Sequence, residues 1–361
     1  MKRKLIYILP VLLGLVVGII ILLINPRAGQ KVGDMLYSSG VNVDSYSYAV
    51  ARAVPSVVNI YVTHLNKDYS SPETDLSSIT TSASGVIMSS DGYIVTNYHV
   101  VPSVKAPNQA IWAMTRNGDM YQAMVVGYDR RTDIAVLKID AHNLPPIPMD
   151  NKHETQVGDV VLAIGNPNNL GQTVTHGIIS ATSRSGTGLL ARNQMNIREG
   201  LQDLIQTDAP INSGNSGGAL VNTAGNLVGI NTASFNGYLA YGIGFAVPAK
   251  LVSSVMSDII KQGRVIRGYL GISDNGTTPA ATDGSVGVKV GLVDPSGPAV
   301  GLLQAGDIIF EMNGKRFSSL KELIEKVSRT KPGTKIKFGI RRGNSTGEVE
   351  VVLAEDSPYV S

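Results

Sequence analysis

The sequence predicts a mainly β protein, with a barrel or a pair of barrels followed by a smaller α+β unit. Between about residues 54 and 248, short apolar runs rich in Val and Ile alternate with turn signals, as expected of strands. The same stretch has almost no helical periodicity, and its turns recur regularly, which is typical of barrels. The chain of 361 residues has room for two folded domains, and its hydrophobic content of 43% suffices for a core in each.

The first expected element is a membrane segment. Residues 5–24 carry no charge, and 20 residues at about 1.5 Å each match a hydrocarbon core of about 30 Å. A cleaved signal peptide is the alternative, but its apolar region usually has about 7–15 residues and precedes a small-x-small site, whereas this run ends in Asn-Pro-Arg. The cations at positions 2–4 favour the cytoplasmic side for the N-terminus. We therefore expect a cytoplasmic stub and transmembrane anchor over residues 1–30, with the rest of the chain outside the cytoplasm.

The composition excludes several classes of function. The formal net charge is +3, and the three cations at positions 2–4 account for it, so the body of the chain is neutral. A neutral body has no electrostatic footprint for nucleic acid. The absence of Cys excludes disulfide scaffolds, thiol catalysis, zinc fingers and iron–sulfur ligation. We expect neither a metal nor a cofactor.

Turn signals organise the chain after the membrane segment. The polar, Gly- and Ser-rich residues 31–47 are typical of a tether. Asn117-Gly118, between two apolar runs, predicts a two-residue hairpin turn in which both residues adopt positive φ. Ala224-Gly225-Asn226 separates another pair of expected strands. Residues 48–263 are therefore expected to form one β-rich domain.

A helix is expected at the end of this domain. Apolar residues between Ala249 and Gln262 follow helical spacing, and Gly263 is placed to end the helix. The remaining residues, 264–361, suit an independent small domain of strands around two predicted helices, one near Pro298–Leu303 and one at Ser319–Val327.

The segment from Asn212 to Leu220 carries the candidate nucleophile. Ser216 lies in a Gly-rich loop just before an apolar strand, so a tight turn can present its hydroxyl. The amides of Gly214 and Ser216 would then point at a common spot and stabilise the oxyanion of a tetrahedral intermediate. A plain Gly-rich β-turn is the alternative for this motif taken alone.

The order of residues along the chain narrows the class of enzyme. A serine nucleophile needs an imidazole base, and the base needs an orienting carboxylate. The nucleophile elbow of α/β-hydrolases places its histidine after the serine, but no His follows Ser216. The subtilisin order of Asp, His and Ser requires an α/β sheet, and this segment lacks the alternating helices of such a sheet. The order His, then Asp, then Ser on a β scaffold remains.

His99 and Asp133 are the candidate base and carboxylate. His99 follows an apolar strand and precedes Val100-Val101, so apolar anchors hold it on both sides. Asp133 directly precedes a buried strand and would lie at its mouth, whereas Asp129, nearer a turn, is expected to be solvated. The other histidines are expected in exposed loops, before a Pro-rich turn, or on a strand as a surface or core residue: His64, His142, His153 and His176.

Five segments resemble the HtrA/Deg serine proteases. They are TNYHVV around His99, RTDIAVLKI around Asp133, AIGNP at 163–167, LIQTDAPINSGNSGGAL around Ser216 and IGFAVP at 243–248. The resemblance extends from about Ala49 to the C-terminus. One anchor and a single small C-terminal domain most resemble the DegS type of this family. The resemblance implies a chymotrypsin-like double β-barrel whose catalytic triad is His99, Asp133 and Ser216.

The resemblance also implies roles for residues around the triad. Gly214, Asn215 and Ser216 would form the oxyanion hole, and Ile211 would line a pocket for small aliphatic side chains. Arg184 matches a loop arginine that links the two domains in DegS-like proteins, a solvated loop cation being the alternative. Homotrimers would form through the protease domain. The candidate contacts are Tyr46 and Tyr48, whose alternative role is packing within one subunit.

The final domain resembles a PDZ module. Gly268-Tyr269-Leu270-Gly271-Ile272 corresponds to the loop whose backbone amides capture a peptide C-terminus, so Tyr269, Leu270, Gly271 and Ile272 are the expected peptide-binding residues. The segments Ser296–Ala299 and Gly306–Ile309 strengthen the match. The stretch between Ile272 and Gly287 is shorter than in DegS-type chains.

The resulting main hypothesis is a serine endopeptidase anchored in the bacterial inner membrane, with its protease and PDZ domains in the periplasm. It would be activated by C-terminal peptides of unfolded outer-membrane proteins and would cut a membrane-bound anti-sigma factor in the envelope stress response. A general periplasmic quality-control protease is the second hypothesis, although such relatives often have two PDZ modules and no retained anchor. A non-catalytic peptide-binding scaffold is the third, and the presence of His99, Asp133 and Ser216 argues against it.

Overall fold

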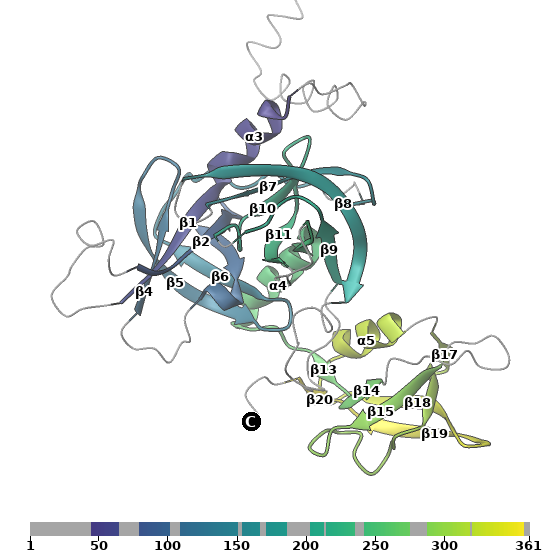
Figure 1. Cartoon of the computed structure of the whole chain (residues 1–361). Helices are drawn as coiled ribbons and strands as arrows, with labels where there is room; N and C mark the ends of the chain where they lie inside the picture. Colours follow the sequence, from purple (N-terminus) through teal and green to yellow (C-terminus); the bar gives the residue numbers. More distant parts are fainter. Residues whose placement is uncertain are drawn as a thin grey trace, which may run out of the picture.

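The computed structural model describes residues 45–64, 79–101, 109–150, 154–166, 171–185, 203–212, 214–234, 242–274, 287–317 and 320–356. These residues form two closed β-barrels and a separate C-terminal domain of strands with one helix (Figure 1). The predicted membrane segment 5–24 lies outside the described residues. Within the described part of the chain, no helix is both long and apolar enough to cross a bilayer.

A short helix and a turn of 3-10 helix lead into the first barrel. They are α3 (Ser47–Ala53) and η1 (Val54–Ser56). The tether was expected to extend to residue 47, but the chain already becomes helical there, because Ala49 and Ala53 pack into the core at 0% exposure. The barrel strands follow in the spatial order β1-β2-β3-β6-β5-β4. Their bounds are β1 (Val57–His64), β2 (Ile79–Ile87), β3 (Tyr93–Asn97), β4 (Gln109–Met114), β5 (Met120–Asp129) and β6 (Ile134–Ile139).

The predicted hairpin at Asn117-Gly118 joins β4 and β5, but its turn type was wrong. Thr115 and Asp119 close the loop through a backbone hydrogen bond of 2.9 Å, which leaves three residues between them. Gly118 has φ +90°, while Asn117 is absent from the described non-glycine residues with positive φ. A three-residue loop needs the left-handed conformation at its last residue only.

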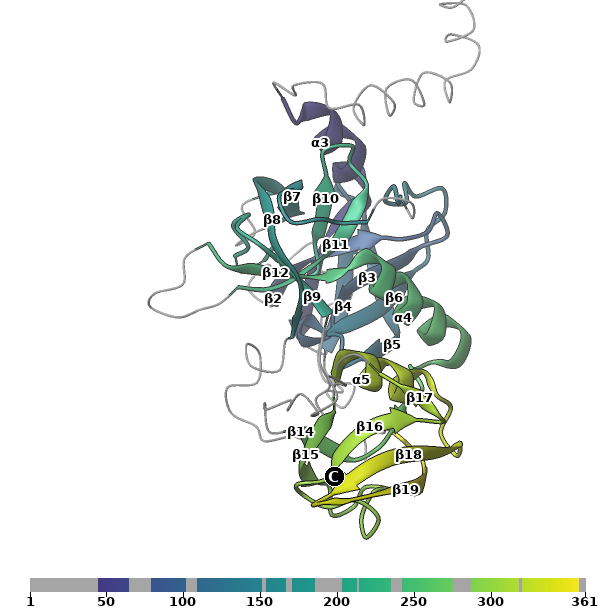
Figure 2. The ribbon, with the colours of Figure 1, turned by 90° about the vertical axis from the view of Figure 1, so that its right-hand side faces the viewer.

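The second barrel repeats the arrangement and ends in the predicted helix. Its strand order is β10-β11-β12-β9-β8-β7. The bounds are β7 (Val160–Gly165), β8 (Thr173–Ser185), β9 (Asp203–Thr207), β10 (Ala219–Asn222), β11 (Leu227–Ser234) and β12 (Gly244–Pro248). Helix α4 (Ala249–Gln262) confirms the prediction at both ends, and Gly263 ends it in the left-handed conformation at φ 75°. Figure 2 shows α4 running from the second barrel alongside β6 and β5 of the first.

One large apolar cluster joins the two barrels. It combines residues of both barrels with Val252, Val255 and Ile259 of α4, all nearly inaccessible to solvent. Each barrel also has its own inner cluster, built around Ile60 and Leu137 in the first and around Val161 and Leu220 in the second. The barrels are therefore fixed against each other, and a site between them has rigid walls.

The C-terminal domain is built on a mixed arrangement of short strands around its own core. A two-stranded ladder pairs β13 with β20, and a larger sheet has the order β14-β15-β16-β18-β19, with β17 paired to β16. The bounds are β13 (Gly268–Tyr269), β14 (Ile272–Asp274), β15 (Val288–Val293), β16 (Ile308–Met312), β17 (Lys315–Arg316), α5 (Leu320–Arg329), β18 (Lys335–Arg342), β19 (Ser345–Val352) and β20 (Ala354–Glu355).

One of the two helices predicted for this domain is present in the structure. Helix α5 confirms the one expected at Ser319–Val327. The one expected near Pro298–Leu303 was wrong, because this stretch is a chain of turns held by short-range bonds such as Val300 N to Gly297 O at 3.3 Å. The six residues from Pro298 to Leu303 are short enough to close such turns without continuing into an α-helix.

Buried ion pairs connect the C-terminal domain to the first barrel. Arg267 donates to both carboxylate oxygens of Asp129, each at 2.7 Å, and Arg131 pairs with Asp356 at 2.5 Å. The expectation that Asp129 is solvated was wrong, since it is 7% exposed and also accepts a bond from Thr132. Burial alone would raise the pKa of Asp129, but Arg267 outweighs it and lowers that pKa overall.

Candidate active site

His99 lies two residues beyond the end of β3, in the 3-10 turn η4 (Tyr98–Val100). The buried run of β3 ends at Asn97, and Val100 and Val101, at 5% and 7% exposure, pack into the first barrel after the histidine. The apolar anchors predicted on both sides of His99 are therefore present. They hold the backbone in the barrel while the imidazole itself remains 49% exposed.

Asp133 is held against His99 by the antiparallel pairing of β3 with β6. Asn97 is the register partner of Ile134, so the end of one strand meets the start of the other. The backbone oxygen of Asp133 accepts bonds from Tyr98 N at 3.0 Å and from the side-chain amide of Asn97 at 3.1 Å. These bonds hold Asp133 at φ 56°, a conformation that non-glycine residues seldom adopt.

The carboxylate of Asp133 accepts three hydrogen bonds. Oδ1 accepts from the backbone N–H of His99 at 3.0 Å, while Oδ2 lies 2.8 Å from His99 Nδ1 and accepts from Thr232 Oγ1 at 2.5 Å. The two contacts to His99 fix both the position and the orientation of the ring. With Nδ1 donating to Asp133, the free electron pair of the ring lies on Nε2, as a general base requires.

The electrostatics of the pair act on the pKa of His99 in opposite directions. Burial lowers it, but the hydrogen bond and negative charge of Asp133 together outweigh burial and raise the pKa above the ordinary value of 6.5. Asp133 therefore stabilises the imidazolium that forms when His99 takes up a proton.

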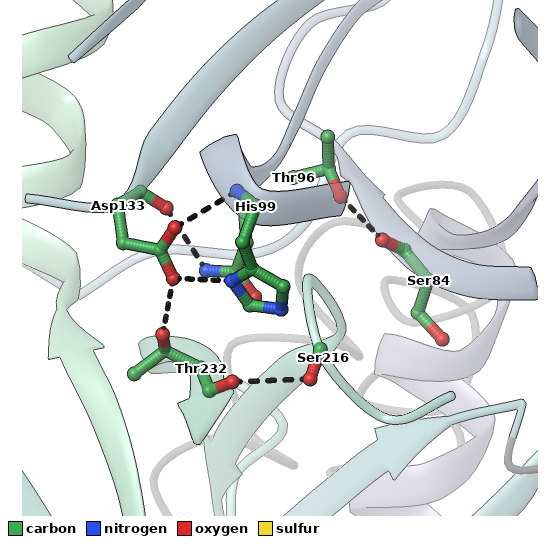
Figure 3. A network of polar contacts seen from close by, with 7 residues as sticks. Ser84, Thr96, His99, Asp133, Ser216 and Thr232 are labelled. Atoms are coloured by element: carbon green, nitrogen blue, oxygen red, sulfur yellow. Dashed lines mark hydrogen bonds and ion pairs between the residues drawn. The ribbon is translucent and has the colours of Figure 1, made fainter. Parts of the chain in front are cut away.

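Ser216 approaches this pair from the second barrel. It lies in the turn 214–217 directly before β10, between glycines with φ +98° at Gly214 and +80° at Gly217. Its hydroxyl donates to the backbone oxygen of Thr232 at 3.0 Å. In Figure 3 the His99 ring lies between Asp133 and Ser216, and Thr232 connects to both Asp133 and Ser216.

The predicted oxyanion loop is tightly fixed. Asn215 is 1% exposed, and its backbone N–H donates to Asn212 O at 3.0 Å. The backbone N–H of Asn215 is therefore engaged within the loop, which leaves those of Gly214 and Ser216 as the donors for an oxyanion. Ile211, expected in the substrate pocket, is 4% exposed and packs in the inner cluster of the second barrel.

Thr232 and Ser84 are two residues of this site that the sequence reasoning missed. They are buried at 2% and 0% exposure, but their strands contain several other polar residues, so the sequence offered no signal that singled them out. Thr232 donates to the Asp133 carboxylate, and Ser84 donates to the backbone oxygen of Gly214 at 2.7 Å.

The remaining histidines lie elsewhere. His142 and His176 are exposed, and the His176 ring lies 5.6 Å from that of Tyr46. The side chain of His64 and all of His153 lie outside the described residues. No group of three or more His, Asp or Glu side chains that could hold a metal occurs within the described ranges.

The residues predicted for peptide capture lie at the start of the C-terminal domain. Tyr269 and Leu270 are buried, Gly271 has φ +77°, and Ile272 begins β14. The Tyr269 hydroxyl donates to Asp294 at 2.6 Å, so this side chain is committed to the domain itself.

The residues expected at the domain link and at the trimer contacts lie in regular elements of the fold. Arg184 lies near the end of β8, paired with Leu204, rather than in a loop, and its side chain lies outside the described residues. Tyr46 packs against the large inter-barrel cluster of its own chain, and Tyr48 belongs to α3.

Comparison with known proteins identifies both domains. Residues 83–230 match the model of the trypsin-like peptidase domain, and residues 268–353 match that of the PDZ domain. The chain is 41% identical over 361 residues to the serine endoprotease DegS of Salmonella typhimurium strain 14028s, which covers 96% of each protein. It is 39% identical to DegS of Haemophilus influenzae over 95% of this chain and 96% of the relative.

A solved structure, the HtrA-type protease AlgW with a tripeptide, matches at 41% identity and TM-score 0.73, over 87% of this chain and 98% of that one. The two barrels and the appended PDZ domain thus agree with both sequence and structural relatives. The chain therefore belongs to the HtrA family of serine endoproteases and has the DegS-type domain arrangement.

Proposed function

We propose that this chain is a membrane-anchored envelope protease that cleaves peptide bonds with His99, Asp133 and Ser216 as its catalytic triad. The observation that carries the assignment is the His99–Asp133 pair of the first barrel, 2.8 Å between Nδ1 and Oδ2, facing the Ser216 loop of the second barrel. The chain order of the three residues and their chemistry both match a serine protease.

The chemistry follows from this geometry. Ser216 Oγ attacks the scissile carbonyl while His99 Nε2 takes up the hydroxyl proton, and Asp133 stabilises the resulting imidazolium. The amides of Gly214 and Ser216 stabilise the oxyanion. The imidazolium then gives its proton to the leaving amine, which produces an acyl-enzyme and a free peptide. A water molecule then attacks the acyl group, and His99 passes its proton to Ser216 Oγ as the acid product leaves. Ile211 helps to select small aliphatic side chains of the substrate.

The biological role we propose is that of a DegS-type regulatory protease. Residues 5–24 anchor the chain in the bacterial inner membrane, with both domains in the periplasm. The PDZ backbone at 269–272 binds C-terminal peptides of unfolded outer-membrane proteins, and Arg184 takes part in relaying this binding to the protease domain. The active enzyme, a homotrimer with Tyr46 and Tyr48 near its contacts, cleaves a membrane-bound anti-sigma factor. Support comes from the near-complete coverage of both chains in the alignment with DegS.

A general periplasmic quality-control protease is the alternative. DegQ of Escherichia coli is 42% identical, but the match covers 75% of this chain and only 58% of that protein. The DegS relatives are matched over 96% of their length, which favours the regulatory role. A non-catalytic scaffold is disfavoured by the hydrogen-bonded His99–Asp133 pair.

The assignment of Ser216 is tested by Ser216→Ala in the full-length protein. The variant should lose peptide-bond cleavage completely while keeping the secondary structure and oligomeric state, since only the nucleophilic oxygen is removed. His99→Ala should lose a comparable factor, and the double variant should lose little more, because triad members act as a unit. Retained cleavage by a clean Ser216→Ala preparation would overturn the assignment.

The regulatory role is tested by initial rates on candidate anti-sigma periplasmic domains at rising concentrations of a peptide that ends in apolar residues. Couplings of about 1–3 kcal/mol are typical, so activation of roughly 5- to 150-fold is expected. Deletion of residues from Gly268 onward should abolish the response. A flat or falling rate in the full-length protein would reject activation by peptide.

A further inference from the structure

Ser84 of β2 connects the first barrel to the nucleophile loop of the second. It is 0% exposed, and its backbone N–H donates to Ser216 O at 2.9 Å, while its hydroxyl donates to Gly214 O at 2.7 Å. One residue of the first barrel thus binds both carbonyls that flank Asn215. These are the peptide groups next to the two amides assigned above to the oxyanion hole.

The hydroxyl of Ser84 also has a second partner, which fixes its direction. Its oxygen accepts from Asn166 N at 2.9 Å, so the single hydroxyl proton is committed to Gly214. The backbone oxygen of Ser84 accepts in turn from Thr96 Oγ1 at 2.7 Å, as Figure 3 shows. Two bonds therefore hold Ser84, from Asn166 N and Thr96 Oγ1, and its two other bonds hold the Ser216 loop.

The surroundings of Ser84 are tightly packed. A Cβ at Gly165 would lie 2.9 Å from Ser84 Oγ, and one at Gly217 would lie 2.1 Å from Ser84 O. Without the hydroxyl, Gly214 O and Asn166 N would lose a buried partner, and the loop would have to shift to find another.

We infer that Ser84 is a positioning residue for catalysis, which sets the peptide planes of the Ser216 loop so that the amides of Gly214 and Ser216 converge on the oxyanion. The inference rests on the catalytic assignment proposed above. It does not place Ser84 in contact with substrate. The first barrel thereby contributes to oxyanion stabilisation in addition to holding the base.

The test is Ser84→Ala in the full-length protein, with Ser82→Ala as the matched control. Ser82 lies two residues earlier on β2, and its buried hydroxyl has no hydrogen-bond partner among the described residues. Removal of one oxyanion donor costs about 10²–10³-fold in kcat, so displacement of the donors through Ser84→Ala should cost roughly 10- to 100-fold. KM should stay within about threefold, and Ser82→Ala should match the native enzyme.

A second measurement separates positioning from a merely structural role. A peptide boronate forms a tetrahedral adduct with the serine and places an oxygen in the oxyanion hole, whereas the matching peptide amide does not. Ser84→Ala should weaken boronate inhibition by at least about tenfold, leave the affinity for the amide unchanged, and keep the acid limb of the pH profile, since His99 and Asp133 are untouched. Ser84→Cys, which replaces the hydroxyl by a somewhat larger thiol with a weak donor, should fall between the native enzyme and the alanine variant, and it serves in the same assays if Ser84→Ala does not fold.

The outcomes are distinct. Native kcat and native boronate inhibition in a folded Ser84 variant would overturn the inference while leaving the triad intact. Equal losses for boronate and amide, or an unchanged kcat per active site with a lower melting temperature, would also overturn it in favour of a structural role. If Ser216→Ala still cleaves, the catalytic assignment fails and the inference falls with it.

Discussion

Replacing Asp133 with Asn tests the electrostatic account of the active site. The side chain keeps its shape, and the structure shows how the amide can fit. With its nitrogen in the place of Oδ2 and its oxygen in the place of Oδ1, the amide can still accept from His99 N. The nitrogen then donates to His99 Nδ1, and the Thr232 hydroxyl can turn to accept. Both contacts to His99 remain, but the ring proton must move to Nε2.

This tautomer cannot accept the proton of Ser216, so the chemical step should slow by about 10⁴-fold, or about 5.5 kcal/mol in the barrier. The pKa of His99 should fall at the same time, because burial still lowers it while the opposing hydrogen bond and charge of Asp133 are gone. The activity of the native enzyme is lost as the pH falls through the pKa of His99. The acid limb of the residual activity of the variant should therefore lie at lower pH.

The free energy of unfolding should also change, and most strongly at low pH. The raised pKa of His99 contributes stability that is fully present below the unfolded value of about 6.5 and is lost as the pH rises through the folded pKa. Asp133→Asn removes this contribution. The measurements are a proton NMR titration of the His99 ring, a pH–rate profile and denaturant unfolding at several pH values. Asp140→Asn is the control, because Asp140 is exposed and directly follows the far end of β6. More than about a tenth of native kcat, or an unchanged pKa of His99, would refute the reasoning.

Three further perturbations probe the loop, the domain interface and the peptide site. Gly217→Ala should destabilise the protein by at least about 2 kcal/mol in denaturant unfolding and reduce cleavage, because Gly217 has φ +80° and a Cβ there would lie 2.1 Å from Ser84 O; native stability would contradict this. Asp129→Ala should cost about 3–5 kcal/mol by leaving the Arg267 guanidinium without its bidentate partner. The double variant Asp129→Leu with Arg267→Met should recover most of that loss in stability. If it loses as much as Asp129→Ala, the account of the uncompensated buried charge is wrong. Gly271→Val should weaken peptide binding at least about tenfold in isothermal titration without affecting Ser216 chemistry, because Gly271 has φ +77°; unchanged affinity would exclude the proposed capture loop.

Local patterns in the sequence were sufficient for the elements whose residues decide their own conformation. Helix α4 ends at Gln262, where Gly263 follows, and the hairpin between β4 and β5 follows from Asn117-Gly118. The turn type of that hairpin was wrong, because the loop length depends on where the ladder between the strands closes, at Thr115 and Asp119. The chain order of His99, Asp133 and Ser216 likewise indicated a site that the fold brings to one place.

Long-range partners could not be predicted in the same way. Asp129 lies in a polar turn, and nothing near it in the sequence shows that Arg267, 138 residues away, covers it. Thr232 and Ser84 carry no motif of their own, and their importance depends on which atoms the two barrels place within 3 Å of them. The partner of a buried hydroxyl is a property of the three-dimensional packing, which the local sequence does not contain.

The division of the active site between two barrels has a consequence for biosynthesis. The first barrel, which emerges from the ribosome first, carries His99 and Asp133, and the second carries Ser216 and Thr232. On the proposed assignment, a nascent or half-translocated chain contains a base without a nucleophile. Cleavage begins only when the second barrel has closed and its loop has docked on Ser84, so completion of folding itself acts as the safeguard against premature proteolysis of neighbouring chains.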